Sequence, residues 1–170
     1  MNPLTDAEFQ AVFDQHKDAV YRFAWRMARS PAAAEDITQD VFVGFLRHPH
    51  RFDPARGTLR AFLLGIARNL ALKHWRAEHR FESLDEDAAV AEPFDVDRGD
   101  VGDIVGRAVG ALRPLQREVV ILAEYEGLTL AEVARAVDAD IGTVKSRLHR
   151  ARENLRRMLA PLRSTQPTTT

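Results

Sequence analysis

The stretch TLAEVARAVDADIGTVKSRLHRARENL, residues 129–155, decides the fold of the C-terminal part of this 170-residue chain. A short amphipathic segment is followed by a tight turn at 137–141 and by a longer segment rich in basic side chains. This order is typical of a helix-turn-helix, in which the second helix enters the major groove of DNA. Apolar residues at helical spacing predict that the two helices pack together, through Val133, Ala134, Val137, Val144 and Leu148.

The second helix of this motif is predicted from Gly142 to about Leu159, ending before Pro161, and it carries the candidate DNA contacts. Its cationic side chains face outward, where they can reach guanine edges or phosphates. At the helix start, the Thr143 hydroxyl and nearby backbone amides suit a phosphate. The predicted DNA-binding residues are Thr143, Lys145, Ser146, Arg147, His149 and Arg150. The alternative is an ordinary solvated basic face, stabilised by pairs such as Arg150 with Glu153.

Helical periodicity also covers the rest of the chain, and no segment alternates as a strand does. Ser30 and Thr58 suit helix N-caps, and Gly127 suits a helix end. The helices predicted before the last one are 6–29, 31–47, 59–79, 101–112, 115–126 and 129–136. The fold class is therefore all-α, with two small helical domains and a linker. The predicted parts are a first domain at 6–80, a linker at 81–102, a helix-turn-helix domain at 103–160 and a disordered tail at 161–170.

Charge is distributed unevenly along the chain, although the net charge is only −1. Between residues 56 and 80, six lysines or arginines accompany one acid, and between 143 and 163 seven accompany one acid. Residues 82–103 hold nine acids and one arginine, without a sustained helical period, which favours a flexible acidic linker. A short surface helix inside one larger domain is the alternative. Two basic stretches of this kind, 56–80 and 143–163, are typical of proteins that bind nucleic acids.

The composition excludes several classes of protein. There is no cysteine, so disulfides, thiolate metal sites and cysteine nucleophiles are excluded. No apolar run is long enough to span a membrane, and the N-terminus lacks a signal peptide, which favours a cytoplasmic protein. There is no phosphate-binding glycine loop, no metal-spaced histidine cluster and no nucleophile motif. We therefore expect neither an enzyme nor a cofactor, a metal or a small-molecule substrate.

Four stretches carry a more specific resemblance. GTVKSRLHRAREXL, with Asn154 at X, and LRPLQREVVILAEYEGLTLAEVA before it resemble region four of extracytoplasmic-function sigma factors, the group-four sigma-70 family. AEDITQDVFVGFLR (34–47) and GTLRAFLLGIARNLALKHWR (57–76) resemble parts of region two of the same family. The resemblance covers about Phe13 to Leu159, in the right order. It implies a sigma factor that directs core RNA polymerase to promoters, melts DNA with the first domain and binds the minus-thirty-five element with the second.

The resemblance also implies partners and site residues. The partners are promoter DNA, core polymerase (its beta-prime coiled coil and beta flap) and an anti-sigma factor. Core polymerase would bind Asp36, Gln39, Asp40 and Phe42, of which the first three share a helix face. The separated minus-ten strand would bind aromatic, amide and cationic side chains, with Phe52 and Asn69 around a flipped base. These residues are Phe52, Arg60, Phe62, Arg68, Asn69, Lys73 and Arg76.

Other functions stay open at this point. A stand-alone helix-turn-helix regulator can carry a similar second helix, but it would need a phosphate-accepting or ligand-binding domain in front. A sigma-like decoy that binds only an anti-sigma factor would lack the basic helix faces. Core packing is the alternative for Phe62, and for Trp75 it is the favoured interpretation.

Overall fold

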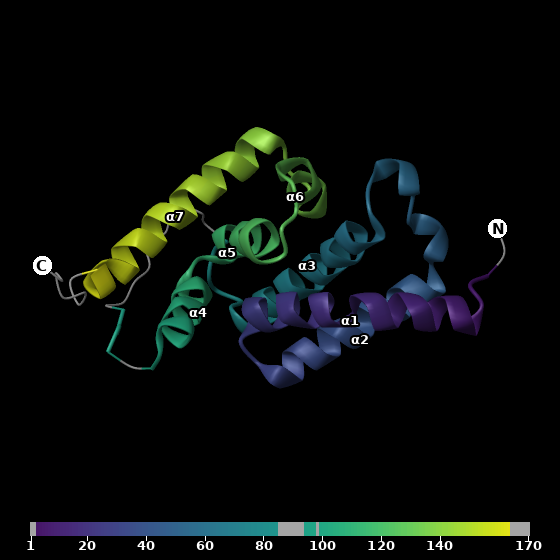
Figure 1. The fold of residues 1–170 in the computed structure, drawn as a ribbon, viewed down its shortest axis with the longest axis horizontal. Coiled ribbons are helices and arrows are strands. Elements are labelled where there is room, and N and C mark those ends of the chain that lie inside the picture. Colours follow the sequence, from purple (N-terminus) through teal and green to yellow (C-terminus); the bar gives the residue numbers. More distant parts are fainter. Residues whose placement is uncertain (1–2, 85–93, 98, 164–170) are drawn as a thin grey trace, which may run out of the picture.

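The computed structural model describes residues 3–84, 94–97 and 99–163, and in these residues every regular element is a helix (Figure 1). We call the helices before residue 81 the N-terminal block and those after residue 100 the C-terminal block. The N-terminal block contains α1 (Asp6–Ala28), α2 (Pro31–Arg47), η1 (Pro49–Arg51), η2 (Pro54–Arg56) and α3 (Leu59–Glu78). The C-terminal block contains α4 (Val101–Ala111), α5 (Pro114–Val120), η3 (Ile121–Tyr125), α6 (Leu130–Ala136) and α7 (Ile141–Arg163). The all-α prediction is confirmed.

Side-chain caps fix where the helices begin. The Ser30 hydroxyl accepts the amide of Ala33, and Thr58 accepts the amide of Ala61, so both predicted caps are confirmed. These oxygens satisfy amides that have no partner inside the helix. The caps thus fix the first residue of each helix.

Two helices differ from their predicted courses. The segment predicted as one helix over 115–126 is α5 followed by the wider turn η3, in which the Glu126 amide donates to the Ile121 carbonyl at 3.0 Å. Gly127, with φ of 68°, then reverses the chain. Helix α7 continues through Pro161 to Arg163 instead of ending before the proline. A proline in the last turn removes only one hydrogen bond, so it does not have to end the helix.

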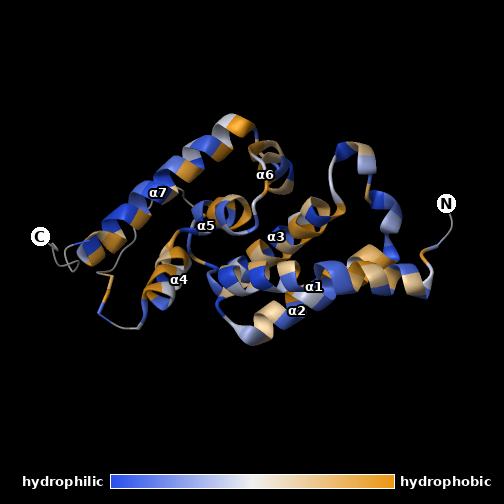
Figure 2. Ribbon diagram, viewed as in Figure 1, coloured by the Kyte–Doolittle hydropathy of each residue, from blue (hydrophilic) through white to orange (hydrophobic). Residues whose placement is uncertain are grey.

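One buried apolar cluster runs through both blocks. Helix α1 packs on α2 and α3, while α5 packs on α7, and α6 lies against both α7 and α3. Phe23, Leu63 and Ile121 are fully buried in this cluster. Hydrophilic and hydrophobic segments alternate along α7 (Figure 2), as expected of a helix with one face in the core. The two blocks therefore pack against each other in this conformation.

The predicted linker and tail lie largely outside the described residues, namely 85–93, 98 and 164–170. The described ends of the linker contact the C-terminal block. Arg113 donates to the carbonyl of Ser83 and lies 3.8 Å from the Glu82 carboxylate. The Arg107 guanidinium lies 5.5 Å from the ring centre of Phe94. Among the described residues, no helix is both long and apolar enough to cross a membrane.

Two glycines should respond in opposite directions to alanine. Gly127 adopts a left-handed φ of 68°, so Gly127→Ala should lower the free energy of unfolding by about 1 kcal/mol. Gly44 lies inside α2 with open space where a Cβ would be, so Gly44→Ala should raise the free energy of unfolding by about 0.5–1 kcal/mol. Urea denaturation followed by circular dichroism measures both. A loss of stability in both variants would contradict the conformational argument.

Candidate nucleic-acid interface

Helices α6 and α7 form the predicted helix-turn-helix. Thr129 and Glu132 make a reciprocal capping box at the start of α6, and Asp138, with φ of 51°, turns the chain toward α7. All five residues predicted to join the two helices are buried: Val133, Ala134, Val137, Val144 and Leu148. This apolar contact fixes the rotation of α7 and hence which of its side chains face solvent.

The side chains of α7 divide into two groups. Lys145, Ser146, His149 and Arg150 are exposed, as predicted. Arg147 is half-buried instead, and its guanidinium lies 3.8 Å from the buried carboxylate of Glu118. The exposed group presents two long cations, a hydroxyl and an imidazole on one surface, which are the side-chain types that contact base edges and phosphates.

The first turn of α7 is capped from within the chain. The Asp140 carboxylate accepts the Thr143 amide at 2.7 Å. This hydrogen bond and one from the Thr143 side chain lower the pKa of Asp140, so the cap is a carboxylate at neutral pH. The Thr143 hydroxyl and nearby backbone amides were predicted to suit a phosphate, and Asp140 occupies both the hydroxyl and the Thr143 amide.

Helix α3 and the turn before it bring the predicted minus-ten residues together. The rings of Phe52 and Phe62 lie 5.5 Å apart at a tilted angle, and both are half-buried. The Asn69 amide is exposed, and its oxygen accepts from Arg68 at 3.3 Å. Lys73 and Arg76 are exposed further along α3, whereas Trp75 is buried and stacked on His79 at 4.4 Å. Trp75 therefore packs in the core, as the favoured interpretation of the sequence predicted.

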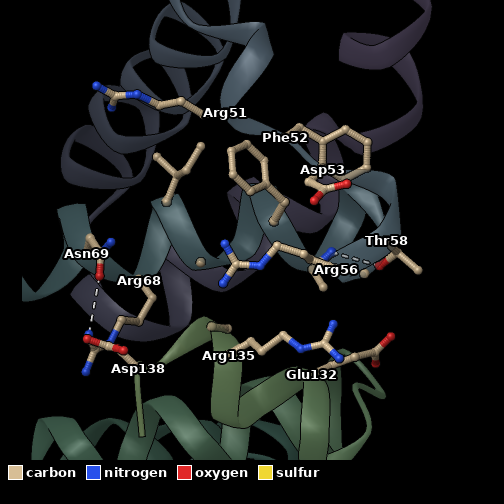
Figure 3. Close-up of a pocket in the computed structure, with 16 residues that line it drawn as sticks. Arg51, Phe52, Asp53, Arg56, Thr58, Arg68, Asn69, Glu132, Arg135 and Asp138 are labelled. Carbon is tan, nitrogen blue, oxygen red and sulfur yellow. Dashed lines mark hydrogen bonds between the residues drawn. The ribbon is translucent and has the colours of Figure 1, made fainter.

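A cleft of about 430 Å³ separates this part of α3 from α6. Figure 3 shows Arg56 and Arg135 extending across the space between the two blocks, with Phe52 and Asn69 on the α3 side. The Arg135 guanidinium approaches Gly57 so closely that a Cβ there would lie 2.9 Å from it. The predicted minus-ten surface is therefore partly covered by the C-terminal block.

Two buried glutamates of the C-terminal block hold arginines of the N-terminal block. The Glu118 carboxylate lies 2.7 and 3.0 Å from two nitrogens of Arg68. The Glu126 carboxylate lies 2.7 Å from Arg60, 3.3 Å from Arg22 and 3.8 Å from Arg26. Arg60 also donates to the Glu126 carbonyl at 2.7 Å. Two of the predicted minus-ten cations are thus engaged inside the protein.

Neither glutamate was identified from the sequence, although one pattern pointed to Glu118. It follows Leu115 by three residues and precedes Leu122 by four, so helical spacing places an acid on an apolar face. A carboxylate in such a place requires a cationic partner. Glu126 follows Leu122 by four residues and Ala123 by three, so similar spacing applies to it, but the wide turn η3 changes the course of the helix just before it.

Arg117 makes a further contact between the blocks. It donates to the carbonyl of Met27 near the end of α1 and to that of Leu112. Burial, with the nearby charges of Arg29 and Arg113, lowers the pKa of Arg117 to about 10. The guanidinium is therefore still protonated at neutral pH and can complete the end of α1.

The predicted polymerase-binding helix presents a polar face. Asp36, Gln39 and Asp40 are exposed on α2, as their spacing predicted. Phe42 is buried, with its ring 4.9 Å from that of Phe13. Leu46, one turn further along α2, is 47% exposed and offers an apolar side chain to a partner. The described residues contain no group of three or more His, Asp or Glu side chains placed to hold a metal ion.

Comparison with known proteins agrees with this architecture. Residues 12–81 match the family Sigma-70 region 2, and residues 102–155 match Sigma-70, region 4. These matches cover the first basic stretch, 56–80, and most of the second, 143–163. A region 2 domain stands where a stand-alone regulator would need a receiver or ligand-binding domain, so that alternative is removed.

Individual relatives have the same assignment. The chain is 36% identical over 163 residues to the ECF RNA polymerase sigma factor SigK of Mycolicibacterium vanbaalenii, covering 91% of this chain and 83% of the relative. It is 34% identical over 154 residues to SigE of Mycolicibacterium smegmatis, covering 86% of this chain and 59% of that relative.

A solved structure shares the fold. The sigma factor RpoE from Bartonella quintana, in complex with the anti-sigma factor NepR, has a TM-score of 0.71 and 26% identity. The match covers 90% of this chain and 97% of RpoE. The chain belongs to the ECF sigma factors of RNA polymerase, non-enzymatic subunits in which region 2 melts the promoter and region 4 binds the minus-thirty-five element.

Proposed function

We propose that α7 recognises the minus-thirty-five duplex through Lys145, Ser146, His149 and Arg150. The observation that carries this proposal is the division of α7 into a buried apolar face and this exposed polar one. Thr143 and Arg147 belong to the same proposed site. Asp140 already binds Thr143, and Glu118 already pairs with Arg147. We therefore assign Thr143 the role of fixing the start of α7 and Arg147 the role of fixing its orientation.

The minus-ten strand binds the surface of α3 and the preceding turn in this proposal. Phe52 and Phe62 offer aromatic faces to separated bases, and Asn69 offers an exposed amide to a base edge. Cations along the backbone path would neutralise phosphates. They are Arg60, Arg68, Lys73 and Arg76.

Core polymerase docks on α2 through the exposed polar face of Asp36, Gln39 and Asp40, with Leu46 and the half-buried Val43 beside it. Phe42 supports this face from the core by packing on Phe13. Carboxylates aligned on one face suit a basic helix such as the beta-prime coiled coil, while region 4 would engage the beta flap. Binding both regions to one polymerase raises the effective concentration of each on the promoter.

The proposed functional units are residues 6–80, an acidic tether at 81–102 and residues 103–160, followed by the tail at 161–170. The solved relative RpoE was co-crystallised with the anti-sigma factor NepR. An anti-sigma factor is therefore the proposed inhibitor of this chain, and the cytoplasm is its proposed location.

In vitro transcription tests the proposed function. Core polymerase with the purified chain should initiate at sites that core alone does not use, on a library of promoters with mapped start sites. A common sequence around minus thirty-five and minus ten should emerge from those sites. Core that captures the chain but initiates nowhere new would reject the proposal.

Asp40→Ala should weaken binding to core polymerase by about 1 kcal/mol, or roughly fivefold, because it removes an exposed carboxylate from the docking face. Asp18→Ala is the matched control, since Asp18 is also an exposed carboxylate but lies on α1 and not on the docking helix. A titration of labelled chain with core polymerase measures both affinities. Equal losses in the two variants would place the docking surface elsewhere.

A further inference from the structure

The contacts between the two blocks involve the same arginines that the proposed function gives to DNA. Arg68 makes a two-pronged contact with Glu118, and Arg60 binds both the side chain and the carbonyl of Glu126. Paired contacts from one guanidinium to two oxygens are also how arginine binds phosphate. Each glutamate therefore occupies its arginine in the way that a DNA phosphate would.

The single negative charge of Glu126 is surrounded by three positively charged side chains. Arg22, Arg26 and Arg60, all from the N-terminal block, converge on this single carboxylate. Once the blocks separate, these guanidinium groups lose their shared counterion. They would then attract a polyanion such as single-stranded DNA.

Backbone contacts show how closely the blocks approach. A Cβ placed on Gly65 of α3 would lie 3.5 Å from the Cα of Ala136 in α6 and 3.9 Å from its Cβ. Arg117 of α5 donates to the Met27 carbonyl of α1. The arrangement is thus held at separate points along α1 and α3, and it places α6 opposite the Phe52 and Asn69 surface, across the cleft.

We propose that Glu118 and Glu126 act as internal phosphate substitutes that hold the free chain in a closed state and keep Arg60 and Arg68 from DNA. Docking on core polymerase separates the blocks and releases these arginines. The inference rests on the proposed function for the role of Arg60 and Arg68. It assigns Glu118 and Glu126 a part in controlling when the minus-ten surface is available.

A cysteine pair can report on the closed state directly. The chain has no cysteine, and the 3.9 Å Cβ separation of residues 65 and 136 lies within the roughly 3.5–4.5 Å range of disulfides. In Gly65→Cys with Ala136→Cys, mild oxidation of the free chain should form the crosslink, visible by mobility on a non-reducing gel. Prior binding to core polymerase should suppress it. Crosslinking that proceeds equally in the polymerase-bound chain would overturn the proposal.

Removing the charge should open the chain. Glu126→Gln in the cysteine-pair background should slow crosslinking, because its ion-pair partners all lie in the other block. Glu118 also contacts Arg147 in its own block, so Glu118→Gln alone would disturb both blocks. It is therefore tested only in a second variant, which carries Glu118→Gln and Glu126→Gln together. Glu124→Gln is the matched control, since Glu124 pairs with Arg152 inside the C-terminal block. An unchanged crosslinking rate in both Glu126→Gln variants would reject the role of the glutamates.

Binding of an oligo-dT strand to the free chain gives an independent readout. Glu126→Gln, with native residues at 65 and 136, should bind about tenfold more tightly than wild type, the factor expected if about one tenth of the wild-type chain is open. Glu124→Gln should bind like wild type, and so rules out a simple net-charge effect. If Glu126→Gln binds no more tightly than Glu124→Gln, the idea that Glu126 keeps arginines from binding DNA is wrong. If crosslinking depends on Glu126 but the wild-type chain never initiates with core, the closed state stands and the proposed function fails.

Discussion

Phe23→Ala should lower the free energy of unfolding of the N-terminal block by about 3–5 kcal/mol. The Phe23 side chain is fully buried, and α1 packs on both α2 and α3. Alanine would leave a cavity that the capped, closely packed helices can fill only in part. Urea denaturation followed by circular dichroism measures the shift in midpoint.

Phe81→Ala is the matched control for this substitution. Phe81 follows α3 and is completely exposed, so the same change should alter stability by no more than about 0.5 kcal/mol. Similar losses in both variants would mean that a factor other than burial, such as aggregation, determines the effect. A small loss in Phe23→Ala alone would show that the core relaxes around the cavity.

Arg150→Ala should weaken binding to the minus-thirty-five element by about 1–3 kcal/mol if the guanidinium contacts a base edge. Arg150 is exposed on the same surface as Lys145, Ser146 and His149. The loss corresponds to about five- to 150-fold in affinity. Holoenzyme binding to promoter duplexes with single base changes measures both the loss and the position at which specificity relaxes.

Arg156→Ala provides the comparison on the same helix. Arg156 is exposed, but it lies six residues beyond Arg150, or about 9 Å further along the axis. It should have a smaller effect and no effect on base preference. A uniform loss for Arg150→Ala across unrelated DNA, with a salt dependence reduced by about one ion, would instead identify a phosphate contact.

The candidate site was only partly predictable from the sequence. Helical spacing correctly placed Lys145 and Arg150 outward, because the apolar residues of one helix fix its rotation. The same reasoning did not foresee that Arg147 faces Glu118, or that Phe42 is buried while Leu46 is exposed. Those outcomes depend on neighbours that lie far away along the chain.

The sequence by itself determined the helices, their caps and the two basic blocks, because hydrophobic spacing and capping act between residues close together in the chain. Only the tertiary structure decided that Glu118 and Glu126 meet Arg68 and Arg60, partners 50 and 66 residues apart. Such ion pairs leave no local pattern that identifies both partners. They form where helix packing buries a charge that must then find an opposite one.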